Sequence, residues 1–163
     1  MDTSKKPKKS AAKRLRIAQI WLFTIILFLT SMPYGVWYEK EKHKTLYATA
    51  LNLIFGQDMR MDAPGNSGYV FSVFIIAPLI ALIAAIFDKN HNIKNILGFV
   101  CSAIGIIWIT YYIRSAIQIG ALLTMFLYLV TCFLSALGFF ATIQENMLKS
   151  DKIKEKVGPR IGD

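Results

Sequence analysis

Four long apolar stretches dominate this sequence, and short charged clusters separate them. An α-helix rises about 1.5 Å per residue, so about 20 apolar residues cross the roughly 30 Å hydrocarbon core of a bilayer. A soluble helix would instead keep charges along its exposed face. The pattern therefore predicts an all-α membrane protein, a four-transmembrane-helix antiparallel bundle, in place of a soluble helical bundle. The predicted spans are residues 17–37, 69–87, 93–113 and 116–143.

The composition agrees with this class. Hydrophobic residues make up 55% of the chain and charged residues 18%, against about 25% charged in a typical soluble domain. The net charge is +9, an excess that in a soluble protein would indicate nucleic-acid binding. Here the basic residues lie beside the apolar stretches, where anionic lipid headgroups are the nearest partner. We therefore expect lipid contact and no nucleic acid.

The basic residues are distributed unevenly about the predicted spans. With the N-terminus inside, the arm 1–16, the turn 88–92 with Lys94, and the tail 144–163 together carry 14 of the 19 Lys and Arg residues. Both termini are predicted to be cytoplasmic, because cytoplasmic segments of membrane proteins are enriched in Lys and Arg. The expected location is the cell membrane, and the Ile-, Lys- and Asn-rich composition favours a bacterial plasma membrane.

The first apolar stretch has a cleavable signal peptide as its alternative. The apolar region of a signal peptide is about 7 to 15 residues long and ends in a small-residue cleavage site. This stretch is longer and ends in Pro33, Tyr34 and Trp37. Aromatic residues are typical of the membrane interface, so we predict a retained span.

Two further predictions concern the segments outside the spans. The outer loop, residues 38–68, contains apolar residues near helical spacing at 46–54, which predicts a short helix on the membrane surface. The first part of the tail is predicted to extend the fourth helix. Gly158-Pro159 should then end that helix.

No ionisable side chain lies well inside the predicted spans. Proton relays and ion-coupled transporters need such groups, and an intramembrane hydrolase needs a nucleophile with a base or a metal. We therefore expect no enzyme activity, no cofactor and no metal. An enzyme would have to use residues outside the spans, namely His43, Asp58, Asp62 or His91.

Small residues recur at helical steps in two of the spans. Such residues let helix backbones approach closely, and packing is the main force that joins helices in lipid. The alternatives are packing within this chain's own bundle and a face for another membrane protein. The predicted helix-packing or partner interface comprises Ala77, Ala81, Ala85, Gly98, Ser102 and Gly105.

The polar and thiol side chains inside the spans are also predicted to have structural roles. Hydroxyls such as those of Ser102, Thr131 and Ser135 should bond a carbonyl one turn back or a neighbouring helix. Cys101 and Cys132 should pack as small hydrophobic residues.

The N-terminal arm is predicted to lie against the cytoplasmic leaflet. Each basic residue near such a surface contributes up to about 1 kcal/mol of attraction to anionic lipid. The predicted anionic-lipid contacts are Lys5, Lys6, Lys8, Lys9, Lys13, Arg14 and Arg16.

The function expected from these features is that of a small, non-enzymatic, multi-pass membrane protein. It would act as a subunit or scaffold of a membrane protein complex, and its partner would be another membrane protein or a second copy. The alternative is a homo-oligomeric channel or transporter for an uncharged or lipidic solute, because four short helices enclose no wide aqueous path on their own.

Overall fold

A computed structural model of the chain describes residues 11–39, 44–55, 68–88, 92–113 and 117–157. The fold is mostly helical, with one small sheet. The elements in chain order are α1 (Ala11–Leu29), β1 (Pro33–Glu39), β2 (Lys44–Thr49), α2 (Ala50–Phe55), the 3-10 helix η1 (Gly68–Ser72), α3 (Val73–Phe87), α4 (Ile93–Tyr112) and α5 (Ile119–Val157).

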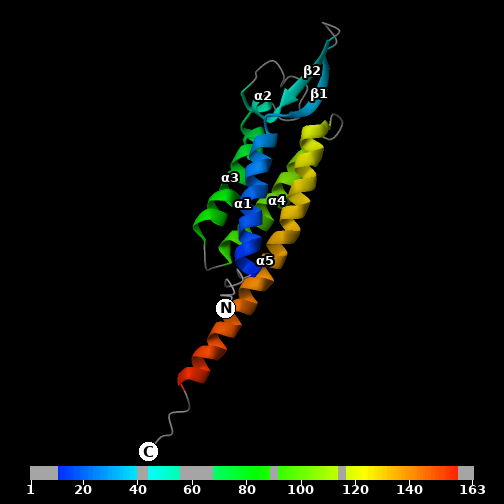
Figure 1. Ribbon diagram of the computed structural model, residues 1–163. Coiled ribbons are helices and arrows are strands. Elements are labelled where there is room, and N and C mark those ends of the chain that lie inside the picture. The colour runs from blue at the N-terminus through cyan, green and yellow to red at the C-terminus, as the bar shows by residue number, and fades with distance from the viewer. Residues whose placement is uncertain (1–10, 40–43, 56–67, 89–91, 114–116, 158–163) are drawn as a thin grey trace, which may run out of the picture.

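The four long helices lie side by side in one bundle (Figure 1). Helix α1 packs on α3 and α5, and α4 packs on the same two helices. The first residue of α1 and the last residue of α5 lie toward the same end of the bundle, and the two strands with α2 cover the opposite end. The chain therefore runs up, down, up and down through the bundle.

Three helices in the described part of the chain are long and apolar enough to cross a membrane. They match the second, third and fourth predicted spans and indicate a multi-pass membrane protein. Helix α1 is not among them, since it carries Lys13, Arg14 and Arg16 in its first turns. The apolar segments are Val70–Phe87, Ile93–Tyr111 and Ile119–Ser150.

The prediction of one helix across residues 17–37 is wrong at both ends. Helix α1 begins earlier, at Ala11, and ends at Leu29. Residues Pro33–Glu39 form strand β1 instead. Pro33 has no backbone N–H, and it disfavours helical geometry in the residue before it. The following sequence, PYGVWYE, is rich in the aromatic and β-branched residues that fit a strand.

The all-α prediction is corrected by the hairpin that β1 forms with β2. The strands pair antiparallel, with Val36 opposite Tyr47. The predicted surface helix is therefore wrong for residues 46–49, which belong to β2, and only Ala50–Phe55 is helical. The ladder to β1 supplies backbone hydrogen bonds that the apolar spacing in the sequence does not reveal.

Tyr34 anchors this hairpin to the helices. Its side chain is fully buried, its hydroxyl lies 2.9 Å from the Thr124 hydroxyl of α5, and its ring centroid lies 5.3 Å from that of Phe74 in α3. Burial raises the pKa of Tyr34 to about 12, against the opposing effect of the Thr124 hydrogen bond. The neutral phenol therefore joins the end cap to two helices of the bundle.

Helix α5 is much longer than a bilayer is thick. Its 39 residues correspond to about 58 Å, nearly twice the roughly 30 Å hydrocarbon core. Figure 1 shows its last turns projecting beyond the other helices. The prediction that this helix continues into the tail is confirmed, since its described part runs to Val157. The predicted stop at Gly158-Pro159 lies outside the described residues.

Candidate functional site

The six small residues predicted to form an interface are buried between helices of this chain. Ala77, Ala81 and Ala85 lie in α3, and Gly98, Ser102 and Gly105 in α4, all in the buried class. Their burial supports packing within this chain's own bundle and leaves little of their surface for a partner.

Gly105 lies under the ring of Tyr128 from α5. A Cβ atom added at Gly105 would lie 2.4 Å from a ring carbon of Tyr128, well inside van der Waals contact. One turn away, the hydroxyls of Ser102 and Thr131 lie 2.8 Å apart. This pair confirms the expectation that hydroxyls inside the spans bond to neighbouring helices.

A buried polar junction joins α1, α4 and α5 near the end of the bundle that holds the start of α1. The Gln19 Nε2 atom donates to the Asn95 Oδ1 atom at 3.2 Å and to the Ser135 Oγ atom at 3.0 Å. All three side chains are at most 2% exposed. One amide from α1 therefore joins α4 and α5.

The junction continues toward the end of the bundle. The Asn95 Nδ2 atom donates to the Asn92 Oδ1 atom at 3.0 Å and approaches the Thr142 hydroxyl at 3.5 Å. Gly138 makes room for this amide, since a Cβ atom there would lie 2.5 Å from the Asn95 Oδ1 atom. The close approach of α4 to α5 therefore depends on a glycine at this step.

One hydrogen-bonding position in the junction is unused within the described residues. The Gln19 Oε1 atom is buried and has no hydrogen-bond partner. The Ser135 hydroxyl accepts from Gln19. Leaving a buried polar group unpaired costs about 1 to 3 kcal/mol, so this arrangement needs an explanation.

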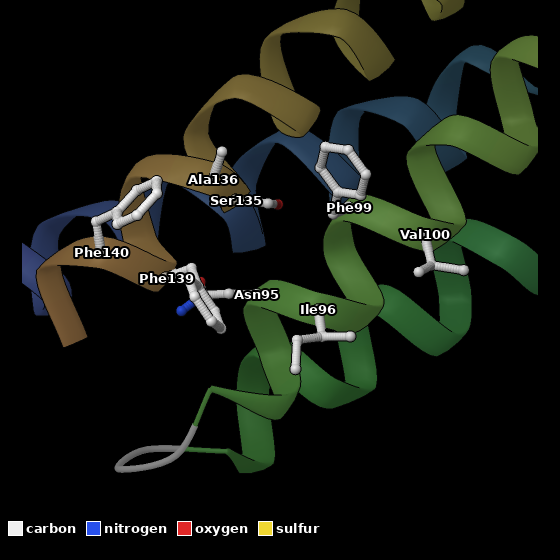
Figure 2. Close-up of a pocket in the computed structure, with 8 residues that line it drawn as sticks. All are labelled: Asn95, Ile96, Phe99, Val100, Ser135, Ala136, Phe139 and Phe140. Carbon is white, nitrogen blue, oxygen red and sulfur yellow. The ribbon is translucent and has the colours of Figure 1, made fainter. Parts of the chain in front are cut away.

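A partly open groove lies directly beside the junction, between α4 and α5. We call it the α4–α5 groove. Its volume is about 220 Å³. Figure 2 shows aromatic and aliphatic side chains around it, with the polar groups of two residues among them. It is lined by Asn95, Ile96, Phe99, Val100, Ser135, Ala136, Phe139 and Phe140.

The predicted lipid-contact residues fall into three groups. Lys5, Lys6, Lys8 and Lys9 lie outside the described residues, and Lys13 and Arg14 are exposed on α1. Arg16 also bonds within the protein, because its Nε and Nη2 atoms donate to the Ala85 and Ile86 carbonyls at 2.7 and 2.8 Å. The guanidinium therefore holds the last carbonyls of α3, where a positive charge is favourable.

We expect the variant Arg16→Ala to lower the stability of the bundle by about 1.5 to 3 kcal/mol, the usual contribution of hydrogen bonds to a charged group. The midpoint of thermal unfolding in mild detergent measures this. Arg14→Ala is the matched control, because Arg14 is exposed on the same helix. Equal midpoints for the two variants would show that Arg16 does not support α3.

The other candidate residues add no reactive centre in the described part of the chain. His43, Asp58, Asp62 and His91 lie outside it. No group of three His, Cys, Asp or Glu side chains within it is placed to hold a metal. Cys101 and Cys132 are free thiols, and the Cys132 Sγ atom lies 3.7 Å from the Phe99 carbonyl oxygen.

Sequence reasoning missed Gln19 and Asn95, the two amides at the centre of the junction. Both stand inside apolar stretches, and an amide in such a stretch requires a partner. That signal was available in the sequence. An isolated amide in an apolar stretch does not identify its hydrogen-bond partner, because Gln19 is separated by 76 positions from Asn95 and by 116 from Ser135.

Comparison of this chain with protein-family models, with curated proteins and with solved structures found no match.

Proposed function

We propose that this chain is a four-span protein of the cell membrane, with both termini in the cytoplasm, that acts as a non-enzymatic subunit of a membrane protein complex. The end of α5 that projects from the bundle is the docking element. The membrane part of the chain supplies the scaffold that holds this element at the cytoplasmic surface.

Helix α1 is the first of the four spans in this proposal. Its 19 residues correspond to about 28 Å, close to the thickness of the hydrocarbon core. The basic residues of its first turns lie at the end of the bundle where charged side chains reach the headgroups. With α1 counted, the even number of spans places both termini on one side, and the distribution of Lys and Arg favours the cytoplasmic side.

The single observation that carries the docking role is the exposure of apolar side chains beyond the bundle. Residues 144–150 continue α5 and are largely exposed. Met147 is 63% exposed and Leu148 55% exposed, within the polar sequence QENMLKSDK. A contiguous exposed apolar surface marks an interaction site, and we propose that Met147 and Leu148 form part of one. An exposed helix end that presents apolar side chains also suits recognition by an apolar groove on another protein.

The test is recovery of partners with the full-length protein from its native membranes in mild detergent. The double variant Met147→Ser/Leu148→Ser should lose partner recovery by more than about tenfold, because burial of each side chain contributes roughly 1.5 to 3 kcal/mol. Quantitative mass spectrometry measures the loss.

The control is the double variant Asn146→Ser/Lys149→Ser, which changes exposed polar residues of the same turn. It should keep the wild-type partners. A protein that purifies without any stoichiometric partner, or one whose partners are unaffected by Met147→Ser/Leu148→Ser, would exclude this docking element.

The α4–α5 groove favours the alternative function, a homo-oligomeric channel or transporter for an uncharged or lipidic solute. The groove is on the outside of the bundle, so a continuous path requires several copies. Reconstitution in liposomes tests this alternative. Absence of flux above empty liposomes, for ions and for small neutral solutes, would rule it out.

A further inference from the structure

We infer that the interior of the helix bundle binds water at two places, one at the amide oxygen of Gln19 and one at the hydroxyl of Tyr128. Both sites lie among packed helices and take one small neutral ligand that donates and accepts hydrogen bonds. They do not depend on the docking role of the α5 end.

The buried polar side chains of α5 lie along one face of the helix. They follow one another at steps of four, three, four and seven residues, and a repeat of about 3.5 residues keeps positions on one side of a helix. All are at most 5% exposed. Their polar groups must therefore find partners inside the protein. The residues are Thr124, Tyr128, Thr131, Ser135 and Thr142.

Two threonines of this face are paired directly with neighbouring elements. The Thr124 hydroxyl lies 2.9 Å from the Tyr34 hydroxyl and donates to the Gly120 carbonyl at 2.8 Å. The Thr131 hydroxyl lies 2.8 Å from the Ser102 hydroxyl. These pairs show that the face meets its neighbours at hydrogen-bonding distance, so an unpaired group on it stands out.

Tyr128 is that unpaired group. Its side chain is fully buried, and its hydroxyl has no hydrogen-bond partner among the described residues. The Cζ atom that carries the hydroxyl lies 2.5 Å from the position of a Cβ atom added at Gly105, so the hydroxyl end of the ring lies against α4 inside the bundle. Along α5 it stands one helical turn from each of the two hydroxyl pairs.

Gln19 provides the second unpaired atom. Its Oε1 atom is buried without a partner, while its Nε2 atom donates to the Asn95 Oδ1 atom and the Ser135 Oγ atom. The amide cannot turn over to pair Oε1, because the Asn95 Oδ1 atom accepts hydrogen bonds only. The Oε1 atom therefore needs a donor that the packed side chains do not supply.

Water fits both atoms. It can donate to an amide oxygen and can both donate to and accept from a phenol hydroxyl. A cation would require several oxygen ligands in place of one, and lipid chains do not reach fully buried atoms. Proteins hold roughly one buried water per 27 residues, bonded to polar groups that are otherwise unpaired, so two are an ordinary number for 163 residues.

The two water sites are separate. Ser135, the partner of Gln19, and Tyr128 lie on either side of Thr131 on α5, and Thr131 is bonded directly to Ser102 at 2.8 Å. This direct contact stands between the two levels. The interior therefore holds individual bound waters rather than a continuous file of water.

The experiment is X-ray radiolysis of the purified full-length protein in nanodiscs, with mass spectrometry to map oxygen addition. Radicals formed from bound water oxidise the adjacent side chain even where bulk water does not reach. We expect Tyr128 to be oxidised several times faster than Tyr34. Tyr34 is the matched control, because it is equally buried but its hydroxyl is bonded to Thr124.

Phe23 reports on the site at Gln19. Its ring and the Gln19 amide both lie 3.7 Å from the position of a Cβ atom added at Gly98, so the two side chains meet there. We expect Phe23 to be oxidised several times faster than Phe74. Phe74 is the control, because its side chain is 1% exposed, as is that of Phe23.

The variant Tyr128→Phe gives a second measurement, because it removes the hydroxyl and keeps the ring. If the hydroxyl is bonded to water, the midpoint of thermal unfolding in mild detergent should fall or stay unchanged. If the hydroxyl is unpaired in a dry interior, the midpoint should rise, because an unpaired buried polar group destabilises the fold.

Equal oxidation of Tyr128 and Tyr34, or a higher midpoint in Tyr128→Phe, would overturn the water site at Tyr128. Equal oxidation of Phe23 and Phe74 would overturn the site at Gln19. Fast oxidation of all four rings alike would show general opening of the bundle in place of bound water, and would overturn both sites.

Discussion

The variant Gly105→Leu is expected to prevent the bundle from packing. A Cβ atom alone would lie 2.4 Å from the Tyr128 ring, and the ring is fully buried. The ring therefore cannot move away without separating α4 from α5. Overpacking by a few atoms already costs about 1 to 3 kcal/mol, and a leucine adds more. Thermal unfolding and size-exclusion profiles in mild detergent should show loss of the folded species.

Three further variants separate this steric effect from a general effect of leucine. Thr110→Leu places the same side chain at an exposed position of α4 and should keep the wild-type midpoint. Gly105→Ala should be destabilised, and Tyr128→Leu should restore part of that loss in the double variant. A Gly105→Leu protein with an unchanged midpoint would show that α4 and α5 do not approach as closely as the structure has them.

The variant Gln19→Ala is expected to have the next largest effect. It removes both hydrogen bonds that the Gln19 amide donates and leaves a cavity where α1, α4 and α5 meet. Hydrogen bonds between membrane helices contribute about 0.6 to 1.7 kcal/mol each, and truncation of a buried side chain to alanine costs about 2 to 5 kcal/mol. We therefore expect a clear fall in the unfolding midpoint.

Gln19→Leu refills most of this space without restoring the hydrogen bonds, so its midpoint should lie between those of Gln19→Ala and the wild type. Trp21→Ala is the control, because Trp21 is 65% exposed on the same helix. The importance of the junction would be refuted if Gln19→Ala unfolded at the same temperature as Trp21→Ala.

The long apolar helices were predictable because their signal is local. The length and apolar character of a run of residues are enough to identify it as a membrane span, whichever helices it packs against. The match of α4 to residues 93–113 follows from this. The same signal failed at residues 33–37, because an apolar strand and an apolar helix are equally hydrophobic over a short run.

The hairpin was missed for a related reason. The segment 44–49 has no strong preference that separates a strand from a surface helix, and its pairing with β1 decides the matter. That pairing is a tertiary contact, since strand stability comes from cross-strand neighbours as much as from the residues themselves.

In the candidate site, too, the local features were predictable from the sequence and the tertiary contacts were not. The small residues of α3 and α4 were predictable as packing positions, because their four-residue steps lie within one helix. The polar junction was not, because it depends on how far α1, α4 and α5 are rotated about their own axes. The same rotation places Asn95 and Ser135 together in the α4–α5 groove.

By itself, the sequence determined the class of this protein, the number of its long apolar helices beyond α1, and the continuation of α5 into the tail. These properties depend on hydropathy and helix stop signals, which act over a few residues at a time. Only the tertiary structure decided that Gln19 reaches Asn95 and Ser135 and that a groove with two polar residues lies beside them. Those contacts join residues far apart in the chain, and the packing of whole helices, not any local preference, determines which buried polar atoms find a partner.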